Sequence, residues 1–116
     1  DVAGTVSRSG AYFQRRLREL VEHPLVGEVR GIGLIAAVEL VADKEKKRLF
    51  SPIGKVNAFV ARRAYENGLI TRAMPAGDSL GFCPPLFSTN EQLDEIVDKM
   101  KLTLDEAIEF SAQYRG

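Results

Sequence analysis

Arg72 is the residue of this sequence whose type and position best suit chemistry. It lies in an apolar stretch typical of a strand, residues 69–74 (LITRAM), and a short loop and a second apolar stretch follow. A guanidinium group presents a planar fork of donors that binds both oxygens of a carboxylate and stays charged. From the residues alone two interpretations remain open. Arg72 binds an anionic ligand, or it forms an internal ion pair or packs its stem at a sheet edge.

The other residue types that enzymes use do not form a catalytic pattern. Catalysis needs a nucleophile, a base or a metal within hydrogen-bond reach of one another. His23 precedes Pro24 at an expected helix end, where a dipole-capping histidine is common. We interpret Cys83 as a small buried hydrophobe and Asp78 as a turn residue. The sequence holds one histidine and one cysteine, and no base lies near Ser51, Ser79 or Ser88. We therefore predict no catalytic residue and no zinc site.

Length and composition favour a single domain. The 116 residues are 45% hydrophobic, which is enough for a packed core. Lysine plus arginine equals aspartate plus glutamate at 16 each, so neither nucleic acid nor an anionic membrane is an expected partner. The sequence has no membrane-length apolar run, we expect no signal peptide, and the single cysteine suits a reducing compartment. We expect a cytoplasmic protein, and a chain that begins without Met is expected to be part of a longer one.

The spacing of apolar residues predicts three helices and two strand pairs. The first helix covers residues 5–22 and the second covers 52–66, with Ser51 as its cap. The third helix begins at Thr89, where Gln92 completes a capping box. Strands are expected within 26–41, at 69–74 and at 80–83, and a charged loop at 43–48. This order predicts an α+β fold, a small and mostly antiparallel sheet with helices packed on one face.

The stretch GIGLIA, residues 31–36, matches a dinucleotide-binding fingerprint only in its letters. That fingerprint needs a helix directly after the first glycines, so that backbone amides can hold a pyrophosphate. Here a strand pattern follows, and we interpret Gly31 and Gly33 as a bulge or a close strand contact. The segment is expected to form two strands, or one long strand bent at a glycine bulge. Arg30 and Glu39 are expected to pair across the sheet.

Three longer stretches together resemble a known family. They are HPLVGEVRGIGLIAAVELV at residues 23–41, ENGLITRAM at 66–74 and GDSLGFCPPLFSTNEQLDEIVDKMKLTLDEA at 77–107. In this order and spacing they look like the C-terminal small domain of class III, fold-type I aminotransferases, which use pyridoxal phosphate. Within the class the likeness is greatest to omega-amino acid and amine:pyruvate transaminases, and it covers nearly all of residues 1–116.

The resemblance implies a division of labour within a longer protein. The Schiff-base lysine and the other residues that hold pyridoxal phosphate would belong to a large domain absent from this chain, so the chain alone would be inactive. The small domain would bind the substrate carboxylate and help close the site. Arg72 matches an arginine that swings in to pair with an amino or keto acid and swings out for an uncharged amine. Family members are dimers or larger assemblies.

Two further hypotheses remain beside the aminotransferase fragment. One is a free-standing α+β module that binds an anion or amino acid through Arg72 without catalysis. The other is a structural interaction domain with a protein partner and no small-molecule site. A fragment of an aminotransferase would carry an apolar surface that the large domain normally covers, whereas a free-standing module would bind its ligand saturably by itself.

Overall fold

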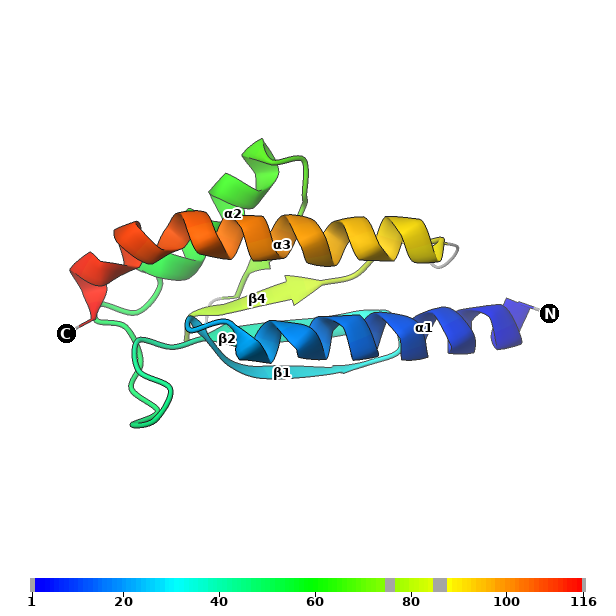
Figure 1. Ribbon diagram of the computed structural model, residues 1–116, viewed down its shortest axis with the longest axis horizontal. Coiled ribbons are helices and arrows are strands. Elements are labelled where there is room, and N and C mark those ends of the chain that lie inside the picture. Colours follow the sequence, from blue (N-terminus) through cyan, green and yellow to red (C-terminus); the bar gives the residue numbers. More distant parts are fainter. Residues whose placement is uncertain (1, 75–76, 85–87, 116) are drawn as a thin grey trace.

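The computed structural model describes residues 2–74, 77–84 and 88–115, and these form three helices and a four-stranded sheet (Figure 1). The expected loop residues 75–76, and Pro85 of the double proline, lie outside this part of the chain. In chain order the elements are α1 (Val2–Arg18), the 3₁₀ helix η1 (Glu19–Glu22), β1 (Val26–Ile32), β2 (Ile35–Leu40), α2 (Lys55–Glu66), β3 (Arg72–Ala73), β4 (Ser79–Phe82), α3 (Asn90–Ser111) and the 3₁₀ helix η2 (Ala112–Tyr114).

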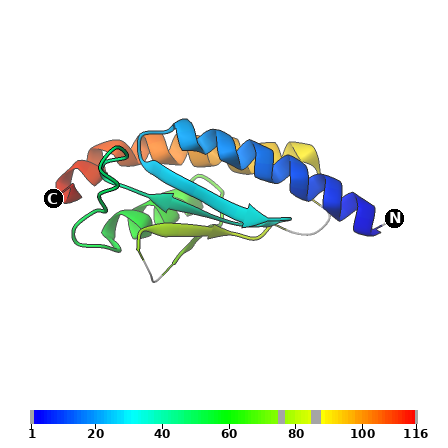
Figure 2. The ribbon, with the colours of Figure 1, turned by 90° about the horizontal axis from the view of Figure 1, so that it is seen from below.

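The sheet is antiparallel throughout, in the order β1-β2-β4-β3. The long helices α1 and α3 lie side by side over one face of it, while α2 packs against α3 and beside β3 and β4 (Figures 1 and 2). The predicted α+β class, with an antiparallel sheet and helices on one face, is therefore confirmed. No described helix is both long enough and apolar enough to cross a membrane.

The core lies between the sheet and the helices, because each strand turns alternate side chains toward them. In β2 the buried residues are Ala36, Val38 and Leu40, whereas Ile35, the first residue of the strand, is exposed. The fully buried side chains come from every layer, which makes the core continuous: Phe13, Leu17, Leu20, Val38, Leu40, Val56, Val60, Leu80, Leu93, Val97, Met100 and Leu104.

The glycine-rich segment forms a hairpin, which is the first of the two arrangements expected for it. A two-residue turn, Gly33 and Leu34, joins β1 and β2, and Gly33 has a φ of 60° that favours glycine. The register shift lies earlier, between Val26 and Glu28. The buried Gln14 of α1 holds the turn, since its Nε2 donates to the carbonyls of Gly33 (2.8 Å) and Ile35 (3.2 Å). A strand rather than a helix follows the glycines, as we interpreted.

The predicted cap of α2 is wrong. The helix begins at Lys55, and its N-cap is Gly54, with a φ of 96° and no side-chain cap of its own. Ser51 is exposed, and its backbone N–H donates to the Tyr114 carbonyl at 2.8 Å. The carboxylate of Asp78 replaces the expected cap, because its Oδ1 accepts from the N–H groups of Gly54 (3.2 Å) and Asn57 (3.0 Å). A local pattern cannot show this contact, which joins residues more than 20 positions apart.

The other helix ends follow local rules. The capping box of Thr89 and Gln92 is present at the start of α3, as predicted. Gly68, with a φ of 87°, follows the end of α2. The predicted helix 5–22 starts earlier, at Val2, and its last turn tightens into η1 before Pro24. The strand expected at 69–74 is reduced to Arg72 and Ala73, because only these two residues pair with β4.

A charged cluster joins α1 to α3 at the surface. Tyr12 donates its hydroxyl to Asp94 Oδ1 at 2.6 Å, and Arg16 Nε donates to the same oxygen at 2.9 Å. Arg16 also donates to Asp98 at 2.9 Å. The pKa of the Asp94 carboxyl lies below its ordinary value, chiefly because of the hydrogen bond from Tyr12 and secondly because of the one from Arg16. An ionised Asp94 is therefore favoured by the folded state.

We expect Tyr12→Phe to lower stability at pH 7 and to lose this effect in acid. A carboxyl whose pKa is depressed by folding adds stability above its unfolded pKa of about 4 and loses it as pH falls through the folded value. The difference in free energy of unfolding between wild type and Tyr12→Phe should therefore shrink below about pH 4. Urea unfolding at pH 7 and pH 3 measures it. Tyr65→Phe is the control, because Tyr65 is 71% exposed; a difference that persists at pH 3 would contradict the prediction.

Candidate functional site

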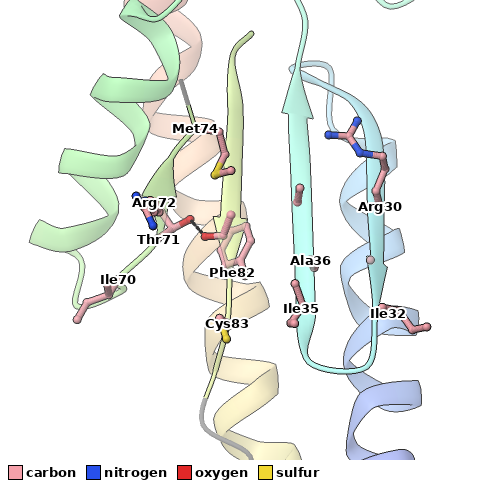
Figure 3. A pocket seen from close by; sticks show the side chains of 13 residues that line it. Arg30, Ile32, Ile35, Ala36, Ile70, Thr71, Arg72, Met74, Phe82 and Cys83 are labelled. Atoms are coloured by element: carbon pink, nitrogen blue, oxygen red, sulfur yellow. Dashed lines mark hydrogen bonds between the residues drawn. The ribbon is translucent and has the colours of Figure 1, made fainter. Parts of the chain in front are cut away.

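The face of the sheet that α1 and α3 leave open carries Arg72. We call it the open face, and Figure 3 looks onto it with α1 and α3 behind the sheet. Strand pairing places Arg30 opposite Ala37, Ala37 opposite Gly81, and Gly81 opposite Arg72. One row across all four strands therefore has an arginine at each edge and two small residues between them.

A second part of the open face is apolar. Ile32 and Ile35 pair at the end of the β1–β2 hairpin and are 81% and 64% exposed, and Ile70, before β3, is 83% exposed. With Cys83 and the arginine row they line a hollow of about 570 Å³ (Figure 3). Large exposed apolar side chains that line one concave surface are typical of a surface covered by another molecule or domain. Strand alternation already places Arg30 and Ile32 on one face, so this surface could have been predicted.

Cys83 corrects one sequence-based interpretation. We expected a small buried hydrophobe, but the residue is exposed at the edge of the hollow. It follows Phe82, whose side chain is buried among the helices, so alternation along the chain turns Cys83 toward the open face. The apolar residues around it suggested burial, yet no helix of the described residues covers this face of the sheet.

Arg72 is exposed and lines the hollow, and it has no ion pair with a carboxylate within residues 2–74, 77–84 and 88–115. Arg30, at the other edge, is different. Its Nη1 lies 3.3 Å from Glu28 and 3.7 Å from Glu39, which confirms the predicted pairing across the sheet. One of the two arginines of this row is therefore neutralised by its own domain, while the other keeps its charge available for an anion.

Hydrogen bonds of the residues on either side of Arg72 hold its strand at the rim of the hollow. The hydroxyl of Thr71 donates to the Gly81 carbonyl at 2.8 Å, and the Met74 N–H donates to the Ser79 carbonyl at 2.9 Å. Gly81, directly opposite Arg72, has no side chain, and the side chain of Met74 lies over it, since a Cβ at Gly81 would be 3.2 Å from Met74 Sδ. Arg72 itself remains exposed.

Other candidates lie away from this hollow. His23 bridges to α3, with Nε2 2.9 Å from Asp105, and its Nδ1 accepts from the Leu25 N–H at 3.1 Å. Asp78 is fully buried at the start of α2. No cluster of potential metal ligands occurs in the described part of the chain. The arrangement can bind an anion next to an apolar group, and it brings no nucleophile and base together.

Comparison with known proteins identifies the family. Residues 1–104 match the family described as "Aminotransferase class-III". The chain belongs to the class-III aminotransferases. Among curated relatives, the aminotransferase y4uB of Sinorhizobium fredii is 52% identical over 98 residues, which are 84% of this chain and 21% of that protein. The putrescine–pyruvate aminotransferase of Pseudomonas aeruginosa is 39% identical over 100 residues, 86% of this chain and 21% of the relative.

The fold agrees with that of solved omega transaminases. The omega transaminase of Pseudomonas jessenii, solved in complex with PMP, superposes with a TM-score of 0.86 at 39% identity. The match covers 96% of this chain and 24% of the P. jessenii chain. This class-III aminotransferase sequence thus spans between a fifth and a quarter of the length of the proteins that it matches.

Proposed function

We propose that this chain is the C-terminal small domain of a pyridoxal-phosphate-dependent transaminase that transfers an amino group from an amine or omega-amino acid to a keto acid such as pyruvate. Its own part in that reaction is to bind the substrate carboxylate through Arg72 and to help close the active site. The observation that carries the proposal is an exposed arginine without a carboxylate partner among the described residues, at the rim of an apolar hollow. The family membership and the pyruvate-using relative support it.

The cofactor is proposed to lie in the large domain of the same polypeptide. A lysine that forms a Schiff base is normally desolvated in a pocket. Here Lys44, Lys46, Lys47 and Lys55 are exposed, and on the surface of α3 Lys99 reaches Glu95 at 2.7 Å and Lys101 reaches Glu19 at 3.5 Å. The exposure of these lysines supports a cofactor site outside this chain. The same proposal places the parent protein in the cytoplasm as a dimer or larger assembly.

The open face is proposed to be the surface that meets the large domain. Three isoleucines between 64% and 83% exposed favour removal from water, at about 25 cal/mol for each Å² of apolar surface. The matched relatives have chains about four times as long, so a covering layer would come from the same polypeptide. An arginine on this surface would then lie between the domains, where closure brings it to a substrate.

Exposure of Arg72 suits a site that must accept two kinds of group. A cation held permanently in an apolar pocket would penalise an uncharged amine, because a buried charge without a partner is costly. A long side chain on a two-residue edge strand can instead turn between the hollow and water. The same position could thus pair with a carboxylate in one half of the reaction and withdraw in the other.

We expect Arg72→Ala in the full-length enzyme to raise KM for keto acids and amino acids about 10- to 100-fold, since a charge-assisted hydrogen bond is lost. Simple amines, which carry no carboxylate, should keep their kinetic constants. Steady-state kinetics with both substrate classes measures the contrast. Arg30→Ala is the matched control, because Arg30 lies in the same row of the open face but is paired with Glu28 and Glu39. An equal loss for acids and amines would reject carboxylate binding by Arg72.

The position of the large domain predicts the reactivity of Cys83. In the full-length protein its thiol should react with a disulfide reagent at least about tenfold more slowly than a cysteine introduced at Glu45 in the exposed loop, because only a covered thiol is protected. Peptide mass mapping after timed labelling gives both rates in one Glu45→Cys variant. Equal rates at Cys83 and at the introduced cysteine would show that the open face remains uncovered.

Pyridoxal phosphate added to the 116-residue chain should form no specific adduct, because its lysines are exposed or form ion pairs at the surface. Absorbance followed by borohydride reduction and mass mapping tests this. A single lysine labelled at sub-stoichiometric pyridoxal phosphate would mean that the chain has a cofactor site of its own. Saturable binding of an amino acid to this chain alone would instead favour the free-standing binding module.

A further inference from the structure

The strand that carries Arg72 is very short and forms few hydrogen bonds with its neighbour. β3 contains two residues, lies at the edge of the sheet and pairs only with β4. Two paired residues cannot define the direction of a long side chain by strand pairing alone. Contacts from outside the strand must therefore set the position of Arg72.

The side chain of Asn57 makes such a contact from α2. It is 2% exposed, and its Nδ2 donates to the carbonyls of Met74 and Ser79, each at 3.1 Å. These two carbonyls belong to opposite arms of the β3–β4 hairpin, and the Met74 N–H also donates to Ser79. One buried amide therefore joins both arms at the point where the chain leaves β3.

The backbone of Asn57 is held by the same hairpin. Its N–H donates to Asp78 Oδ1 at 3.0 Å, and Asp78 in turn connects to the sheet, since the Leu40 N–H donates to the Asp78 carbonyl at 2.8 Å. Asp78 is fully buried. Buried hydrogen bonds of this kind are difficult to replace with water, so they fix the start of α2 against the hairpin.

Arg72 lies between this contact and a second one. On its N-terminal side Thr71 donates to the Gly81 carbonyl at 2.8 Å, and on its C-terminal side Asn57 holds Met74. We propose that Asn57 is a positioning residue that sets where Arg72 meets the substrate carboxylate. This inference rests on the proposed function of Arg72 and extends it to a residue that touches no substrate.

The chain offers a matched control on the same helix. Asn67, at the other end of α2, also uses its Nδ2 for two hydrogen bonds, to Thr103 Oγ1 (2.9 Å) and Glu106 Oε1 (2.8 Å). These join α2 to α3 and do not involve the hairpin. Replacement of either asparagine by leucine keeps four side-chain heavy atoms and the branch at Cγ, while both donors are lost. A general effect on the packing of α2 should follow from both changes, whereas an effect on Arg72 should follow only from the change at position 57.

The test uses the full-length enzyme and its kinetics with a keto acid and, separately, with a simple amine. Asn57→Leu should raise KM for the keto acid about tenfold, because a small displacement of a binding group is costly. The constants for the amine should stay close to wild type, which also shows that the variant folds. Asn67→Leu should change neither substrate class. If Asn57→Leu does not fold, Asn57→Ala, which adds no atoms, is the second variant.

A double variant separates positioning from a structural role. In an Arg72→Ala background, Asn57→Leu should cause no further rise of the keto acid KM, since a residue that acts through Arg72 has nothing left to position. Additive effects would overturn the inference. So would an unchanged keto acid KM in Asn57→Leu while Arg72→Ala raises it. If Arg72→Ala itself leaves that KM unchanged, carboxylate binding is overturned and the positioning role falls with it.

Discussion

Coverage of the sheet on one side determines where the candidate site residues of this chain lie. α1 and α3 bury one face, so the alternation of each strand sends the remaining side chains to the open face. Buried Val38 and Leu80 alternate with Ala37 and Gly81, and the register then aligns these small residues with Arg30 and Arg72. The hollow and its arginine are thus consequences of how the core is packed.

The two arginines of the open face differ through their neighbours. Glu28 and Glu39 lie on the same face as Arg30 and neutralise it. Arg72 stands at the opposite edge, where small and apolar side chains surround it and no described carboxylate pairs with it. An unpaired guanidinium beside apolar surface is unfavourable to cover unless an anion accompanies it. This would be the physical basis of the carboxylate selection that we propose for Arg72.

Buried hydrogen bonds of Asn57 and Asp78, which we call the polar junction, connect α2 to the strands beside Arg72. Asp78 accepts from the first turn of α2, and Asn57 returns a donor to each arm of the hairpin. The junction joins a helix of 12 residues to a strand of two. Carboxylate binding in this class-III aminotransferase domain would thereby depend on residues that lie outside the hollow.

The sequence by itself determined the class of fold, the capping box at Thr89 and the end of α2, because these depend on apolar spacing and on residues close in the chain. The sequence also indicated the aminotransferase family of the chain and made Arg72 the candidate site residue. Only the tertiary structure decided that Asp78 caps α2, that Cys83 is exposed and that Asn57 holds the hairpin. These features join segments about 20 residues apart or depend on which face of the sheet is covered. Hydrogen bonds and burial of that kind exist only after the helices have packed, so local patterns contain no signal for them.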